Sequence, residues 1–117
     1  MKRLMTQEKL KLALSFDIEA TGETPLNGSM VMLGVVAVLE DATPVDTTPI
    51  ENWTIDSKQW CLKEILPRGE RCWTEFWLKH QDVWEFIQKH AVDASVAMAE
   101  LSEWIKSLSE RYIVYWV

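Results

Sequence analysis

Length, composition and charge already exclude several classes of protein. The chain has 117 residues, of which 48% are hydrophobic and 26% charged, with seven tryptophans and a net charge of −6. This length suits a single domain spanning residues 1–117, and the apolar content excludes a disordered acidic tail. The acidic total argues against a protein that holds nucleic acid mainly by neutralising phosphates.

The cellular location is predicted from features that the sequence lacks. No apolar run approaches the roughly 18 residues that indicate a membrane span. The basic start, Met1 to Leu4, is followed by no long apolar segment, so we expect no secretory signal. Cys61 and Cys72 are too few for a disulfide scaffold and lack the paired spacing of a structural zinc site. We therefore expect a cytoplasmic domain with no membrane partner.

The first half of the chain predicts three strands. Residues 10–19 alternate apolar and polar or small side chains, which is the period of a half-buried strand. Residues 20–29 form a turn-rich loop, and residues 30–39 are apolar throughout, which is typical of a central strand covered on both faces. Residues 50–55 form a shorter candidate strand. Three successive strands predict an antiparallel meander.

The second half predicts helices followed by one strand. Residues 73–79 and 82–89 have apolar faces at helical spacing. Residues 93–109 form a longer helix with Asp93 at its N-cap and an apolar stripe made of Ala97, Leu101, Trp104, Ile105 and Leu108. A last strand, residues 111–117, follows this crossover and is expected to lie parallel to an earlier strand. The fold class is α/β, a mixed sheet with helices packed on it.

Two carboxylates on the first strand carry the chemical signal. Asp17 and Glu19 are two residues apart, so both side chains leave the same face. Two like charges on a strand that otherwise faces a core need water, a basic partner or a cation. Mg²⁺ accepts one or two carboxylates together with phosphate oxygens, and paired ions cleave phosphodiesters. The alternative is a strand that simply emerges into solvent at its C-terminal end.

The residues around this pair resemble a known family. Residues 15–22, Ser-Phe-Asp-Ile-Glu-Ala-Thr-Gly, resemble the first motif of the DEDD superfamily of 3′–5′ exonucleases, which reads Phe/Leu-Asp-x-Glu-Thr/Ser-Thr-Gly. Ala20 is the one departure from that motif. Residues 32–37 are similar to the second strand of the family. Residues 73–84 resemble its bacterial, phage and viral exoribonuclease branch.

The resemblance implies a fold, an activity and a site. The fold would be ribonuclease H-like, and the activity would be two-metal hydrolysis of terminal phosphodiesters at the 3′ end of RNA or single-stranded DNA. Asp17 and Glu19 would be catalytic and would hold Mg²⁺ or Mn²⁺. The residues that contact the terminal nucleotide would be Ala20, Thr21 and Gly22.

The family has four acidic ligands, and its third follows the strand after the long helix. Here that strand ends at Val117, so we expect the chain to be an N-terminal portion that a complementing C-terminal segment completes. The alternative is a non-catalytic remnant of the same fold that binds a partner or forms a homodimer, because a sheet without its full set of helices exposes apolar surface and a free edge.

Other candidate sites have simpler explanations. The Trp-rich segment at residues 73–84 could stack bases, but side chains at helical spacing are more often core. His80 and His90 are expected at the surface, since neither has a cysteine or carboxylate at ligand spacing. Lys63, Arg68 and Arg71 form a loose basic group that could meet phosphates, although a solvated loop is the favoured interpretation.

Overall fold

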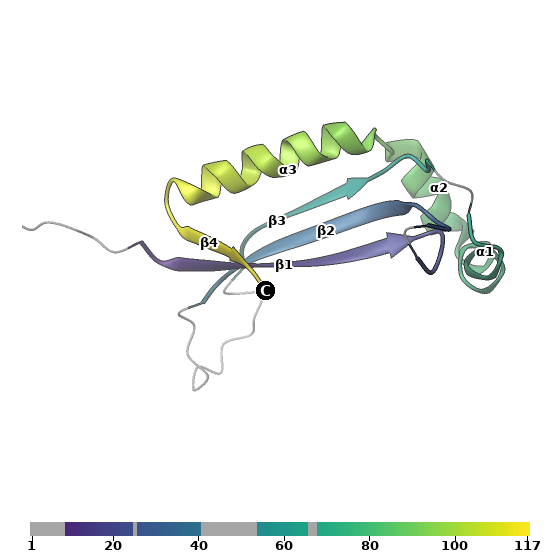
Figure 1. Ribbon diagram of the computed structural model, residues 1–117, viewed down its shortest axis with the longest axis horizontal. Helices are drawn as coiled ribbons and strands as arrows, with labels where there is room; N and C mark the ends of the chain where they lie inside the picture. Colours follow the sequence, from purple (N-terminus) through teal and green to yellow (C-terminus); the bar gives the residue numbers. More distant parts are fainter. Residues whose placement is uncertain (1–8, 25, 41–53, 66–67) are drawn as a thin grey trace, which may run out of the picture.

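The fold is a four-stranded mixed sheet with the long helix over one face and the shorter helices at one end (Figure 1). The computed structural model describes residues 9–24, 26–40, 54–65 and 68–117. The elements are β1 Lys11–Ala20, β2 Met30–Leu39, β3 Thr54–Cys61, α1 Glu70–Glu75, the 3-10 helix η2 Trp77–Lys79, α2 Gln81–His90, α3 Ala94–Ser109 and β4 Ile113–Trp116. The strands lie in the order β3-β2-β1-β4; β1, β2 and β3 are antiparallel neighbours, and β4 is parallel to β1.

The predicted meander and the parallel last strand are both confirmed. The predicted burial of one face of β1 is confirmed in its first half, where Leu12 and Leu14 are fully buried, but not in its second half, where Phe16 and Ile18 of the same face are 55% and 44% exposed. Strand β4 follows the helical crossover and pairs Leu12 with Val114 in parallel. The expected α/β class, a mixed sheet with packed helices, is therefore correct.

Strand β2 is central, as predicted, but its two faces differ. Val31, Leu33, Val35 and Ala37 are buried, whereas Val36 on the other face is 39% exposed. The expected covering of both faces is not found in the described part of the chain. The reason is that α3 packs on one face only, which is visible in Figure 1.

The third strand lies further along the chain than predicted. Residues 50–53 of the predicted strand 50–55 lie outside the described residues, and β3 continues from Thr54 to Cys61. The segment from Asp56 to Gln59 is polar and exposed, so it lacks the alternation of apolar and polar residues from which a strand is predicted. It is a strand because its backbone pairs with β2 at the sheet edge.

Helix α3 builds the main core, and its predicted stripe is confirmed. Ala97, Trp104 and Leu108 are buried against the sheet, with Leu101 and Ile105 packed beside them. Their partners come from all three meander strands: Leu12, Leu14, Leu33, Val35, Ala37 and Trp60.

Asp93 occupies the predicted N-cap position of α3 without capping it. Its side chain makes no hydrogen bond to the helix N-terminus. Instead, its carboxylate lies 3.3 Å from the ammonium group of Lys63. Both side chains are more than half exposed, so this ion pair adds little stability.

A second core lies at the other end of the sheet, under α2 and η2. Trp77, Trp84 and Ile87 are buried against Val31 and Cys61. The core interpretation of the Trp-rich segment at residues 73–84 is therefore correct for Trp77 and Trp84, whereas Phe76 and Leu78 are exposed. Within the described residues, no helix is long and apolar enough to cross a bilayer.

A matched pair of leucines tests the main core. Leu14 is fully buried, whereas Leu26 is 92% exposed. We expect Leu14→Ala to lower the free energy of unfolding by about 2–5 kcal/mol, because it removes buried apolar contacts and leaves a cavity. Leu26→Ala should change it by less than about 0.5 kcal/mol. Urea denaturation followed by circular dichroism measures both values, and equal effects would contradict this assignment of the core.

The contact between α3 and the edge strand predicts a pH dependence. Trp104 donates its indole N–H to Asp56 at 2.8 Å, and this bond lowers the pKa of the carboxyl below its ordinary value of 3.8. A carboxyl with a lowered folded pKa stabilises the fold above its unfolded pKa, and this contribution is lost as the pH falls. Asp56→Asn should therefore be less stable than wild type at about pH 7, and the gap should narrow toward about pH 2.

Urea titrations at the two pH values measure that gap. Glu103→Gln is the control, since it removes an exposed carboxylate from α3 that makes no such contact with Trp104. A gap for Asp56→Asn that is the same at both pH values would show that the hydrogen bond contributes no linked stability.

Candidate functional site

Asp17 and Glu19 lie together on the face of the sheet that α3 does not cover. Since Leu12 and Leu14 point toward α3, the odd-numbered residues of β1 point to the opposite face. Asp17 is exposed and Glu19 is half-buried. The structure thus places the two predicted site residues side by side on an open surface.

A shallow depression surrounds the pair. Gly34 of β2 lies directly opposite Asp17, and Gln59 of β3 lies beyond it. Met32 of β2 lies directly opposite Glu19, as Gly34 does opposite Asp17. A cavity of about 210 Å³ is bounded by these side chains. Gly34 leaves this floor open, since a Cβ there would meet only the carbonyl oxygen of Asp17, at 4.0 Å.

The two carboxylates have no basic partner in the described part of the chain. The ion pairs found there involve other acids, and the one hydrogen bond to Asp17 comes from the backbone N–H of Ile18, at 3.0 Å. Two neighbouring negative charges are therefore balanced by solvent or by a cation. This is the electrostatic condition that a hard divalent cation satisfies.

The donor set limits which metal site the residues can form. Within the described ranges, no group of three or more His, Cys, Asp or Glu side chains is placed to hold a metal ion. Two carboxylates fit one Mg²⁺ or Mn²⁺ that keeps several waters or takes substrate oxygens. They are too few for a two-ion centre, so a second ion needs ligands from outside these residues.

The segment after the pair is held from inside the protein. Thr21 is fully buried, and its hydroxyl accepts the backbone N–H of Ser29 at 2.8 Å. Its backbone N–H donates to the Ser29 carbonyl at 2.9 Å, and its own carbonyl accepts the N–H of Gly69 at 2.6 Å. Every polar group of Thr21 is thus used in joining this segment to Ser29, directly before β2, and to Gly69, directly before α1.

Ala20 and Gly22 complete this junction. The indole N–H of buried Trp77 donates to the Ala20 carbonyl at 3.0 Å, which ties the end of β1 to η2. Gly22 is required by packing, because a Cβ there would collide with the Asn27 backbone. The nucleotide contacts expected of Ala20, Thr21 and Gly22 stay a prediction. The structure gives these residues a positioning role beside Glu19.

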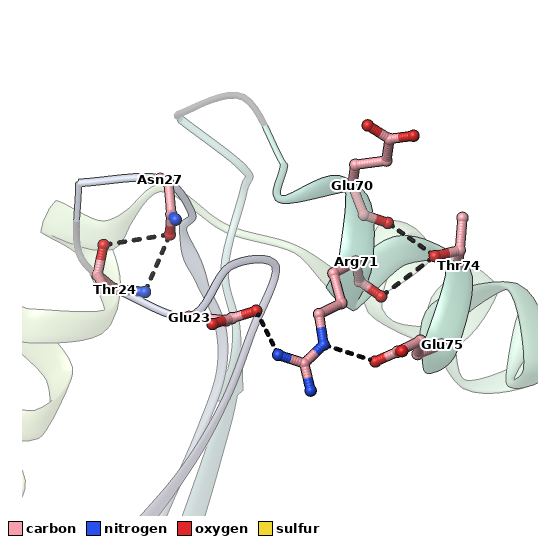
Figure 2. A network of polar contacts seen from close by, with 7 residues as sticks. All are labelled: Glu23, Thr24, Asn27, Glu70, Arg71, Thr74 and Glu75. Carbon is pink, nitrogen blue, oxygen red and sulfur yellow. Dashed lines mark hydrogen bonds and ion pairs between the residues drawn. The ribbon is translucent and has the colours of Figure 1, made fainter.

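Figure 2 shows how the same loop is joined to α1 by polar side chains. Arg71 lies between Glu23 of the loop, at 3.2 Å, and Glu75 of its own helix, at 2.9 Å. On the loop side, Thr24 donates its backbone N–H and its hydroxyl to the Asn27 side chain. These exposed contacts orient the loop and add modest stability.

The loose basic group predicted at Lys63, Arg68 and Arg71 does not act as one patch. Each member pairs with a different carboxylate, and Arg68 contacts Glu64 at 3.0 Å. The Arg68 guanidinium also lies 3.8 Å from the centre of the Trp73 ring. These cations therefore neutralise neighbouring acids and cover aromatic surface.

The remaining candidates lie away from the acidic pair. His80 and His90 are exposed at the two ends of α2, as expected of surface histidines. Cys61 is buried, which raises the pKa of its thiol and disfavours a nucleophilic thiolate. Gln59 was missed from the sequence, since a glutamine in a polar run gives no signal until the sheet register places it near Asp17.

No protein-family model, curated protein or solved structure matches this chain. The resemblance to the exonuclease family consequently rests on residues 15–22 and on the flanking segments quoted above.

Two glycines on opposite sides of the site test whether packing constrains the loop. Gly22→Ala places a Cβ against the Asn27 backbone, and we expect it to lower the free energy of unfolding by about 1–3 kcal/mol. Gly34→Ala enters open space on a strand and should be neutral or slightly stabilising. Thermal and urea denaturation compare the two variants. A tolerated Gly22→Ala would contradict the close packing of the loop.

Proposed function

We propose that this chain carries part of the metal site of a 3′–5′ exonuclease that acts on RNA or single-stranded DNA. One observation carries the proposal: Asp17 and Glu19 share an open face at the end of β1, with no basic partner in the described residues. The alternative of a strand emerging into solvent explains their exposure. It does not explain why two like charges are adjacent above a depression floored by glycine.

The order of the elements supports a ribonuclease H-like fold. A three-stranded antiparallel meander, a helical crossover and a strand parallel to β1 are compatible with that arrangement. The order of strands and helices does not by itself identify a fold family, so the ribonuclease H-like fold is proposed here together with the function.

The chemistry follows from what the two carboxylates can hold. Asp17 and Glu19 would bind Mg²⁺ or Mn²⁺ through hard oxygen donors. The bound ion would activate water and offset the negative charge of the phosphodiester. The chain contributes cation binding and an open face for the substrate strand, with Trp77 and Gly69 holding the adjacent backbone in place.

The register of β4 indicates where a third ligand would enter. Trp116 lies opposite Leu14, and the two strands are parallel. A segment that continued β4 in this register would place its third residue after Trp116 beside Asp17, on the same face. A complementing segment could thus add a carboxylate to the pair without any change in the sheet.

A non-catalytic, partner-binding role is the second candidate, and a specific observation favours it. Phe16 and Ile18 are 55% and 44% exposed on the α3 side of β1, where β4 no longer pairs. Trp116 is 48% exposed beside them, in an edge-to-face contact with Phe16 at 5.8 Å. An apolar cluster at a free sheet edge is typical of an interaction surface.

Cation binding tests the proposal. We expect Mn²⁺ to bind weakly, with a dissociation constant on the order of 1 mM, because the ion keeps most of its waters. Asp17→Asn combined with Glu19→Gln should abolish the calorimetric signal. Glu85→Gln combined with Glu103→Gln removes two exposed acids elsewhere and should leave it unchanged.

Hydrolysis and mass separate the two candidates. A 5′-labelled single-stranded RNA incubated with Mn²⁺ should shorten from its 3′ end, and the Asp17/Glu19 double variant should not shorten it. Hydrolysis by that variant would refute the assignment of the site. Absence of Mn²⁺ binding, together with a dimeric mass by light scattering, would favour the partner-binding role.

A further inference from the structure

A groove runs along the outer edge of β3, on the side of the sheet that carries α3. Strand β3 is at the end of the sheet order, and α3 lies over it (Figure 1). A cavity of about 590 Å³ lies between the two elements, with Trp60 and Trp104 among its walls. A second cavity of about 320 Å³ shares Gln59 and Trp60 with the first and extends toward α2.

The backbone of this edge already accepts a strand-like partner at one point. Val92 forms a parallel bridge with Leu62: its N–H donates to Cys61 at 2.9 Å, and its carbonyl accepts the N–H of Lys63 at 3.0 Å. The N–H of Leu62 itself points the other way and donates to the carbonyl of Val31 in β2, at 2.9 Å. Successive residues of β3 therefore alternate between bonding to β2 and pointing outward.

The next outward-pointing groups are unused. By this alternation, the carbonyl of Gln59 and the N–H of Cys61 point away from β2, one step along from the Val92 bridge. In the described part of the chain, neither group has a hydrogen-bond partner. They adjoin the smaller cavity, so there is room for an incoming backbone. An unpaired edge of this kind is a template for strand addition.

The groove walls define the side chains that would fit. The indole N–H groups of Trp60 and Trp104 are already bonded to Glu100, at 2.9 Å, and to Asp56, at 2.8 Å. The two rings are therefore held in fixed positions, and only 8% of Trp60 and 9% of Trp104 is exposed, so each presents a narrow apolar strip to the groove. Glu100 and Glu103 line the larger cavity against a single cation, Lys58, so its charge is negative.

We propose that the β3–α3 groove binds an extended peptide that adds as a strand parallel to β3, with apolar side chains against the tryptophans and a Lys or Arg facing Glu103. The parallel direction is the one that Val92 already adopts. Main-chain hydrogen bonds give affinity, and alternate side chains give specificity, as in other proteins that bind peptides between an edge strand and a helix. This site is separate from the proposed metal site, which lies on the opposite face.

Synthetic peptides test the mode of binding without any change to the protein. The probe is a fluorescein-labelled, C-terminally amidated peptide, Thr-Val-Thr-Lys-Thr-Val-Thr, whose two valines and lysine share one face of the strand, with Thr-Val-Thr-Glu-Thr-Val-Thr as its acidic counterpart. Fluorescence anisotropy should show the basic peptide binding at least about tenfold more tightly. Two further basic peptides carry N-methyl groups, one at its odd and the other at its even residues. The peptide whose methyl groups replace the N–H groups that face β3 should lose at least about tenfold in affinity, and the other should not.

Protein variants locate the site. Glu103→Lys reverses the charge of the groove wall and should weaken the basic peptide at least about tenfold. Glu85→Lys makes the same change on an exposed position of α2 and should leave the affinity unchanged. Gln59→Pro removes the outward N–H of this residue and should also weaken binding, while the hydrogen bonds that its neighbours in β3 make to β2 are kept. Circular dichroism confirms that each variant is folded.

Several outcomes would overturn the proposal. The first is that the basic peptide does not bind at concentrations up to about 1 mM. The second is that the two N-methylated peptides bind with equal affinity, and the third is that Glu103→Lys leaves the affinity for the basic peptide unchanged. Sedimentation that shows a dimer dissociated by Gln59→Pro, but not by the peptide, would assign the edge to a second copy of the chain instead.

Discussion

Leu12 and Leu14 are fully buried beneath α3, and the rest of the molecule depends on this one-sided packing. Because side chains alternate along a strand, burying these leucines sends Asp17 and Glu19 to the opposite face. Desolvating two unpaired carboxylates in a core would cost several kcal/mol. The same alternation thus builds the core on one side and leaves a charged, hydrated surface on the other.

Tryptophan N–H groups join the helices to the sheet at three points. Trp77 donates to the backbone at Ala20, and Trp60 and Trp104 donate to Glu100 and Asp56. An indole buries a large apolar ring and still satisfies one polar partner, so it can cross the boundary between core and surface. The first contact holds the strand end beside the acidic pair, and the other two shape the groove along β3.

The two proposed sites use different properties of the same sheet. The acidic pair depends on side-chain alternation within β1, whereas the groove depends on β3 being an edge with outward backbone groups. Gln59 contributes to both regions, because its side chain borders the acidic depression while its backbone faces the groove.

Local patterns in the sequence determined β1, β2, the long helix and the placement of Asp17 and Glu19 on one face, since these follow from apolar runs and from periods of two and 3.6 residues. Tertiary structure alone decided the rest. Strand β3 has a polar sequence and exists through pairing with β2, and the inward-turned Thr21 and the position of Gln59 arise from contacts between distant segments. Periodicity records which side of an element is apolar, whereas an exposed strand edge or a hydrogen bond across the fold leaves no periodic trace in the chain.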